Sequence, residues 1–393
     1  MATRFQQNRA GCSHFGVPIS SGLLAEFGCE LEPTLFAVLG GRPACRGFAA
    51  TSGVPFIGIS GPTNWGYGCT PRGPAYFYKY PSVDSRACHY AIVVDNYHYI
   101  STYMEDPLRK YTSQGDLVTS TEIDDLHENK EAPFASCWCH ATNHLYLVTT
   151  YALRMYDSDL NRLWTLWWFE DTEYHAMSRM TIDAAGQIYL ANGRKQGESS
   201  SYNRLIKIDQ TSRTVLWDTL FNNEGNAGVA DCLSCSLDGY LYAGRRRGVV
   251  DEEKSIYRYT QAGGSASGSV RAITHGHGVV SLCCTPGGYV IAGIREYDPE
   301  DEWGGVAHIK KFSSGLGGIW IYTPDTACVA IGAVACDDHD HVYASATLNW
   351  YSVPTDVLFA LTADGDLRWA SPPWTTNDGC YSGLHYWPVT WLG

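Results

Sequence analysis

Long apolar runs are missing from this 393-residue chain, and so are several common functional motifs. No stretch of about eighteen consecutive apolar residues occurs, which excludes a membrane-spanning helix. The opening residues, MATRFQQNRAGCSHFG, contain no apolar run, so no secretory signal is expected there. The patterns G-x-S-x-G and H-E-x-x-H and the P-loop are also absent, and the common hydrolase, zincin and nucleotide-binding signatures are excluded with them.

Basic residues are scarce relative to acidic ones. The chain has 28 Lys and Arg against 41 Asp and Glu, which gives a net charge of −13 at pH 7. An acidic surface repels phosphate groups, so nucleic acid and anionic membranes are poor candidate partners, and no membrane insertion is expected.

Aromatic residues and glycine are abundant. The sequence contains 13 Trp, 26 Tyr, 12 Phe and 40 Gly, with 45% hydrophobic and 18% charged residues. This mixture favours many short strands and tight turns, and it argues against an all-helical fold. The chain is long enough for one or two globular domains with a large core.

The 14 cysteines leave the compartment open. Their number suggests an oxidising or extracellular location, whereas the missing secretory signal argues against ordinary secretion. A location on a virion or an extracellular surface, reached without a signal peptide, accommodates both observations. The alternative is the cytoplasm.

A repeat of roughly 43 to 53 residues runs through most of the chain. Each copy has a turn dipeptide followed by a short aromatic strand, as in VDNYHYIST, ATNHLYLVT and SLDGYLYAG. The penultimate strand position of each copy is Tyr99, Tyr146, Tyr189, Tyr242, Ile291, Tyr343 or Trp391. That period fits one four-stranded blade of a β-propeller.

A second motif follows each copy and predicts a hairpin, as in RLIKIDQTSRTVLW and VLFALTADGDLRW. Four of these hairpins carry tryptophan at the same place: Trp164, Trp217, Trp320 and Trp369. Identical placement in successive repeats is what packing between blades requires, so we predict a structural role for these side chains.

The fold predicted from these repeats is all-β, a seven-bladed β-propeller of four-stranded antiparallel blades. The segment PAYFYKYPSVD, with Tyr80, is predicted to be an outer strand without an inner partner before it in the chain. The strands around 383–393 are predicted to supply the inner half of the same blade, which would close the ring and remove its exposed edges.

These repeats resemble the PQQ-like, WD40-like repeats of bacterial and viral β-propellers over residues 74–393. The resemblance implies a propeller and says little about function. Residues 1–73 lie outside it and form an irregular N-terminal arm that bears Gly, Pro and Cys, predicted to serve in attachment or capping. The recurrent GH…WD pairs of WD-repeat scaffolds are missing, which disfavours an intracellular hub.

One face of this propeller is predicted to carry function. Turns between the first and second strands and between the third and fourth are short, whereas the connections on the opposite face are long, acidic and aromatic. Exposed aromatic residues among charges favour a partner-binding surface over a solvated rim. The candidate binding residues on this face are Arg246, Glu296, Asp298, Asp301, Trp303, Trp350 and Tyr351.

Histidines and carboxylates precede two of the predicted inner strands, near the mouth of the central channel. Imidazoles with a carboxylate can bind a divalent metal, although the Gly-flanked histidines also suit a simple turn. No cofactor is predicted, and a divalent metal is the alternative. The candidate ligands are Asp171, Glu173, His175, His275 and His277.

The leading hypothesis is a non-enzymatic binding or assembly module that contacts protein or glycan through its long-looped face. It is similar to structural or adhesion components of phage and other virus particles, which implies particle assembly or oligomerisation through the N-terminal arm. The alternative is a propeller enzyme with a metal or quinone at the channel mouth, acting as a lyase, hydrolase or dehydrogenase.

Overall fold

The fold consists almost entirely of antiparallel β-sheets, in a computed structural model of the 393-residue chain. The described residues are 56–59, 65–70, 73–79, 88–94, 97–102, 108–112, 117–123, 133–139, 142–149, 151–172, 174–175, 177, 179–195, 204–221, 230–245, 254–272, 277–298, 301–324, 328, 330–336, 340–347, 355–370 and 374–375. Within these ranges the all-β prediction is confirmed.

Six sheets each contain four strands that are consecutive or nearly so in the chain. The first two sheets are β4 (Cys88–Val94), β5 (Tyr97–Thr102), β6 (Leu108–Thr112) and β7 (Leu117–Thr121), then β8 (Pro133–Cys139), β9 (His144–Thr149), β10 (Ala152–Tyr156) and β11 (Arg162–Trp167). A single helical turn, α3 (Trp168–Asp171), follows β11.

The next two sheets continue the pattern. Their strands are β13 (Arg179–Ile182), β14 (Ile188–Lys195), β15 (Arg204–Ile208) and β16 (Val215–Leu220), then β17 (Ala230–Cys235), β18 (Tyr240–Arg245), β19 (Ile256–Thr260) and β20 (Ala266–Val270). A two-residue strand, β12 (Tyr174–His175), also pairs with β14.

The last two of the six sheets show the same order. Their strands are β21 (His277–Cys284), β22 (Val290–Asp298), β23 (Asp301–Phe312) and β24 (Gly318–Tyr322), then β25 (Ala330–Cys336), β26 (Val342–Thr347), β27 (Thr355–Leu361) and β28 (Leu367–Ala370). Strand β29 (Trp374–Thr375) adds a short pairing with β27.

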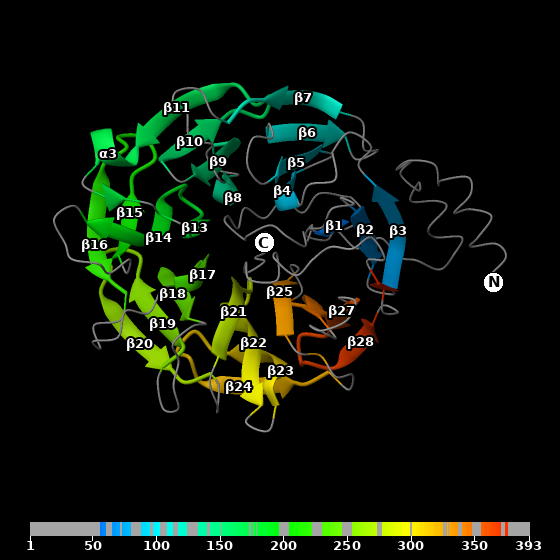
Figure 1. The fold of residues 1–393 in the computed structure, drawn as a ribbon. Coiled ribbons are helices and arrows are strands. Elements are labelled where there is room, and N and C mark those ends of the chain that lie inside the picture. The colour runs from blue at the N-terminus through cyan, green and yellow to red at the C-terminus, as the bar shows by residue number, and fades with distance from the viewer. Residues whose placement is uncertain are drawn as a thin grey trace.

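The sheets stand around a common centre in a propeller-like arrangement. Figure 1 shows the first strands β8, β13, β17 and β21 innermost and the fourth strands β11, β16, β20 and β24 at the rim. The second strand of each of the six sheets contains its predicted repeat anchor, for example Tyr189 in β14 and Tyr242 in β18. Trp391 lies outside the described residues.

A seventh, three-stranded sheet lies between the first and the last of these six (Figure 1). Its strands are β1 (Phe56–Ile59), β2 (Trp65–Thr70) and β3 (Gly73–Lys79). The prediction that the segment around Tyr80 lacks an inner partner before it is wrong, because β3 pairs with β2 in the register Gly66↔Tyr78. This sheet therefore crosses the predicted arm boundary at residue 73. The predicted strands of 383–393 lie outside the described residues.

The core lies between neighbouring sheets. Tyr189 and Leu205 of one sheet, for example, pack with Leu233 and Leu241 of the next, and all four are at most 2% exposed. The second strands are buried on both faces, which is why their sequences read as continuous apolar runs. The fourth strands alternate instead, because only one of their faces is covered.

Outer turns fasten each sheet to its predecessor. The ammonium of Lys207 and the indole N–H of Trp217 both donate to the carbonyl oxygen of Gln261 in the next sheet, each at 3.1 Å. Lys311 and Trp320 repeat the arrangement on Ala363, at 2.8 and 3.0 Å.

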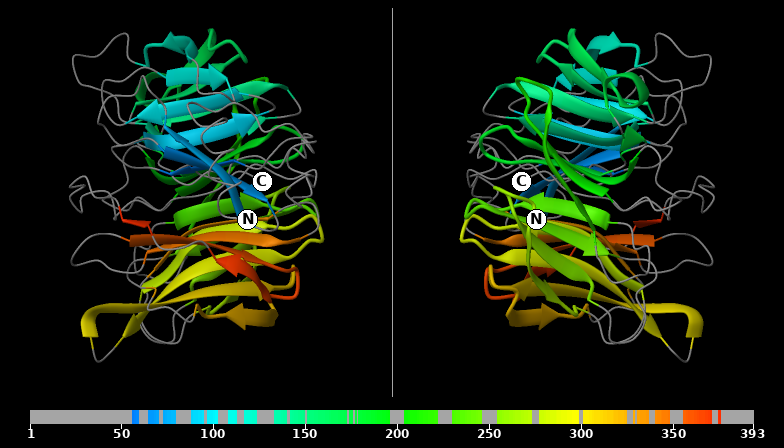
Figure 2. Two further views of the ribbon diagram at one scale, coloured as in Figure 1. Left: turned by 90° about the vertical axis from the view of Figure 1, so that its right-hand side faces the viewer. Right: turned by 90° about the vertical axis from the view of Figure 1, so that its left-hand side faces the viewer.

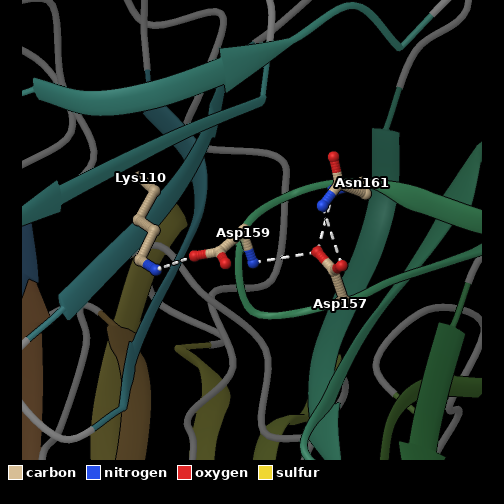
Figure 3. A network of polar contacts seen from close by, with 4 residues as sticks. All are labelled: Lys110, Asp157, Asp159 and Asn161. Carbon is tan, nitrogen blue, oxygen red and sulfur yellow. Dashed lines mark hydrogen bonds and ion pairs between the residues drawn. The ribbon is translucent and has the colours of Figure 1, made fainter.

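Equivalent contacts join two other pairs of sheets. Arg258 donates from Nη1 to the carbonyl oxygen of Ser314 at 2.6 Å, and Tyr242 donates to the same oxygen at 2.8 Å. Lys110 reaches the Asp159 carboxylate at 2.9 Å in the turn 157–161, where Asp157 accepts hydrogen bonds from Asn161 (Figure 3). A basic third-strand residue therefore recurs as a link between sheets.

Candidate functional site

One hairpin distinguishes the side of the molecule that bears the longer connections. Strands β22 and β23 extend past the neighbouring sheets as a two-stranded ribbon, coloured yellow in Figure 2. Within the described residues, β21 pairs with β22 no further than His277↔Glu296, and β24 pairs with β23 no further than Tyr322↔Ile309. The segment IREYDPEDEWGG, which carries four of the residues predicted to lie on the long connections, is therefore mostly strand.

The turns on the opposite side are short and held by local hydrogen bonds. Backbone bonds close the turn between Ser313 and Gly317 at 2.8 Å and the turn between Thr362 and Asp366 at 2.8 Å. Gly264 and Gly365 have φ values of +64° and +92°, and a Cβ on either would lie within 3.0 Å of the ring of Trp217 or Trp320. These glycines are needed both for the turn and for the close approach of the tryptophan.

The ribbon accounts for four of the seven predicted binding residues. Asp298 and Asp301 pair with each other at its end, and Trp303 follows in β23. Glu296 is mostly buried: it lies at the base of the ribbon and is 9% exposed. Arg246, Trp350 and Tyr351 lie outside the described residues.

The imidazole of His308 contacts the Glu296 carboxylate at that base. The distance from His308 Nε2 to Glu296 Oε2 is 3.2 Å, and the two side chains are 13% and 11% exposed. Burial lowers the pKa of His308 below its usual value, and this outweighs the nearby Glu296 carboxylate, which acts to raise it. Lys310 on the same strand lowers that pKa further.

Lys310 ties the base of the ribbon to the preceding sheet. Its ammonium donates to the carbonyl oxygen of Ala272 at 2.6 Å. Burial lowers the pKa of Lys310, while Glu296 acts to raise it. His308 Nδ1 also lies 2.9 Å from Thr323 Oγ1, just beyond the end of β24. The ribbon therefore rises from a base of linked, mostly buried polar groups.

The predicted metal ligands are distributed over two sheets. His175 lies in β12 across from Arg194, and His277 begins β21 across from Glu296, with the sheet β17 to β20 between them. Glu173 and His275 are outside the described residues.

Asp171, another predicted metal ligand, makes a hydrogen bond within its own segment. It lies in the single turn α3 and accepts a hydrogen bond from the backbone of Trp167 at 2.8 Å. Among the described side chains, no group of three or more His, Cys, Asp or Glu could hold a metal ion. The metal site remains a prediction, which metal analysis of wild type and His275→Ala would test.

A buried polar cluster joins the sheet that begins with β13 to the sheet that begins with β17. Arg179 donates from Nε to the backbone oxygen of Asp231 at 2.8 Å, and Asn192 bonds both the N–H and the C=O of Ala230 at 2.8 and 2.7 Å. Asp231 lies at a bulge in β17, and the first strands β8, β21 and β25 are bulged at the corresponding level. These bonds satisfy buried polar groups and hold the first strands of the two sheets together.

The four tryptophans predicted to pack between blades all lie on fourth strands. Trp217 and Trp320 donate to the next sheet as described, and Arg213 of the next sheet lies over the ring of Trp164 at 5.4 Å. The indole N–H of Trp369 is buried and has no hydrogen-bond partner among the described residues.

Eight buried cysteines in the described part of the chain are thiols and form no disulfide there. Burial raises the pKa of Cys137 and Cys235 well above the usual thiol value. Neighbouring thiols add to this, Cys139 for Cys137 and Cys284 for Cys235. These residues belong to a core of inert thiols.

No helix among the residues described has the length and hydropathy needed to span a bilayer.

Sequence reasoning missed His308, Lys310 and Thr323. The signal in the sequence that could have found the first two is the alternation of the polar residues His308 and Lys310 with buried Ile309. Alternation of that kind places two titratable groups on one face of a strand.

No protein-family model matches this sequence, and no curated protein matches it either. Among solved structures, KlHsv2 with loop 6CD replaced by a Gly-Ser linker is similar, with a TM-score of 0.53 and 8% identity over 85% of this chain and 99% of that chain. The Neurospora crassa Pan2 WD40 domain gives 0.45 and 10% over 72% and 87%. A protein of unknown function from Bacteroides caccae gives 0.47 and 9% over 75% and 97%.

At such low identity the similarity to KlHsv2 shows the fold alone. It agrees with the propeller-like arrangement of the sheets. The likeness to PQQ-like repeats rests on the sequence motifs only.

Proposed function

We propose that this protein is a propeller-like module that binds a protein partner through the side bearing the longer connections, with the ribbon β22 and β23 as its main contact element. The observation that carries the proposal is the length of the ribbon beyond its neighbours. Past the rung His277↔Glu296, Tyr297 and Asp298 pair, among the residues that the structure describes, with β23 only. A ribbon fixed at its base and projecting from a rigid scaffold is suited to contact another molecule.

The charge of the ribbon favours a basic partner surface. Residues 296–302, with the sequence Glu-Tyr-Asp-Pro-Glu-Asp-Glu, include five carboxylates and no basic residue. The whole chain carries −13, so its field steers positively charged partners and repels acidic ones. Trp303, next in the sequence, is of the residue type that most often anchors interfaces.

A shortened ribbon tests this proposal. Replacing residues 297–305 by Asn-Gly joins the paired residues Glu296 and Val306 through a two-residue hairpin turn and retains the base. Wild type, the shortened variant and a control, Leu216→Ser on the outer strand β16, are used to capture proteins from an extract of the source organism. We expect a basic partner that wild type and Leu216→Ser retain and the shortened variant loses.

The same partner should be released by moderate salt, because exposed charge pairs are screened. Retention of the same proteins by the shortened variant, or no retained partner for wild type, contradicts the proposal. If a glycan displaces the captured protein from wild type, the ligand of this surface is a carbohydrate and not a protein.

We also propose that a strand from the C-terminal segment completes the three-stranded sheet and closes a seven-bladed ring. A chain ending before Leu384 should then unfold less cooperatively than the full chain. The attachment role of the N-terminal arm, in a virus particle or another extracellular assembly, belongs to this proposal as well. Deletion of residues 1–55, which keeps β1, should abolish assembly and leave the melting temperature unchanged.

A further inference from the structure

A hydroxyl, an imidazole and a carboxylate stand in line across three neighbouring strands. Thr323 Oγ1 lies 2.9 Å from His308 Nδ1, and His308 Nε2 lies 3.2 Å from Glu296 Oε2. The contacts therefore use both ring nitrogens of one histidine, one for a hydroxyl and the other for a carboxylate.

The register of the sheet explains this alignment. Ile309↔Tyr322 is the last rung between β23 and β24, so Thr323 follows directly across from His308. On the other side His308 pairs with Ile294, which makes Glu296 its diagonal neighbour in β22. Diagonal neighbours lie within reach of long side chains. Pro324 follows Thr323 and restricts its backbone to extended conformations.

The protonation states suit proton transfer from the hydroxyl. A neutral His308 that donates from Nε2 to Glu296 has Nδ1 as its acceptor, and that atom faces the Thr323 hydroxyl. Burial lowers the pKa of His308, which keeps the ring neutral at pH 7. Thr323 is exposed while Glu296 and His308 are mostly buried, so a substrate has access to the hydroxyl.

We propose that Thr323, His308 and Glu296 form a hydrolytic triad that cleaves small carboxylic esters. The logic is that of an activated nucleophile: the base lies within hydrogen-bond reach of the hydroxyl, and a third group orients the base. This activity is independent of partner binding by the ribbon.

The hydrolysis needs no reactant besides the ester and water. Thr323 Oγ1 bonds to the ester carbonyl carbon as its proton moves to His308 Nδ1. The carbon–oxygen bond to the alcohol breaks, and the alcohol leaves with that proton. Water then adds to the acyl-threonine, again losing a proton to His308, and the carboxylic acid and the free Thr323 hydroxyl are regenerated.

The test is turnover of p-nitrophenyl acetate by the full-length protein, with the acyl-enzyme trapped by acid and located by peptide mass. We expect acetylation at Thr323 and a rate that falls by about 10²-fold in Thr323→Val. Thr323→Ser, which keeps the hydroxyl, should retain turnover. Glu296→Gln and His308→Gln should each reduce it.

Because Thr323 is exposed, we expect Thr323→Val to fold as wild type does, and melting temperatures of all variants are measured alongside the rates. Equal turnover by wild type and Thr323→Val overturns the proposal, and so does a wild-type rate that matches buffer alone. A lower melting temperature for Thr323→Val with unchanged hydrolysis assigns the three residues a purely structural role and overturns it too.

Discussion

The indole N–H of Trp320 donates a hydrogen bond of 3.0 Å to the carbonyl oxygen of Ala363, in the outer turn of the following sheet. Trp217 makes the same bond to Gln261 at 3.1 Å. Each bond joins two sheets that also pack through apolar side chains and are linked by a lysine of the third strand. The repeated tryptophan therefore helps to hold one sheet against the next.

Replacing Trp320 by Phe should remove this bond and keep most of the apolar contact. We expect the free energy of unfolding to fall by about 1 kcal/mol, the usual net value of one hydrogen bond. Denaturant unfolding measures it. Trp369→Phe is the matched control, because its indole N–H has no hydrogen-bond partner among the described residues. An equal loss in both variants would contradict the role assigned to the Trp320 bond.

The turn 157–161 should weaken in acid. Burial acts to raise the pKa of Asp157, but hydrogen bonds from Asn161 and from the amide of Asp159 outweigh it and lower that pKa below its usual value. A lowered carboxyl pKa adds stability that is present above about pH 4 and lost as the pH falls through the folded value.

Asp157→Asn should therefore lose stability at pH 7 and converge with wild type in acid. The free energy of unfolding at pH 7 and at about pH 3 tests this. Asp159→Asn, in the same turn, retains an acceptor for Lys110 and serves as the control (Figure 3). A deficit of Asp157→Asn that is the same at both pH values would count against the proposed linkage.

His308 should make stability depend on pH in a higher window. Its pKa is lowered in the folded state, so its contribution is present above the unfolded value of about 6.5 and declines as the pH falls below it. His308→Gln should flatten the curve of unfolding free energy between about pH 7 and pH 5. Some slope should remain, because burial also lowers the pKa of His144. Identical slopes for wild type and variant would be the contrary result.

The buried thiols should resist alkylation in the native protein. Burial raises the pKa of Cys137 and Cys235, so little thiolate is present at pH 7. We expect iodoacetamide to spare the eight described cysteines in the native state and to label them after unfolding in urea, as read by peptide mass. Labelling of Cys235 under native conditions would contradict the assignment to the core.

The repeat made most of the fold predictable. Alternating aromatic strands and turn residues such as those around Tyr189 are local signals, and they placed the second strand of six sheets. The strands β1 and β2 were not predictable, because their sequences contain no copy of the repeat. Pairing between β2 and β3 follows from tertiary packing, which outweighs local pattern at an irregular segment.

The base of the ribbon was harder to predict than the ribbon residues themselves. Glu296 was predicted to be a residue of the partner-binding face, whereas its register brings it to His308. Contacts between strands depend on register, and a shift by one residue would separate the two side chains. From one sequence, the alternation of residues within a strand can be predicted. The register between two strands depends on the turns that join them.

The claim that the ribbon binds a partner is tested most directly by amide hydrogen exchange of the complex against the protein alone. We expect added protection over Tyr297–Gly305, with little change in the short turns of the opposite side such as 313–317. Protection confined to the fourth strands or to those short turns, with exchange of the ribbon unchanged, would contradict it.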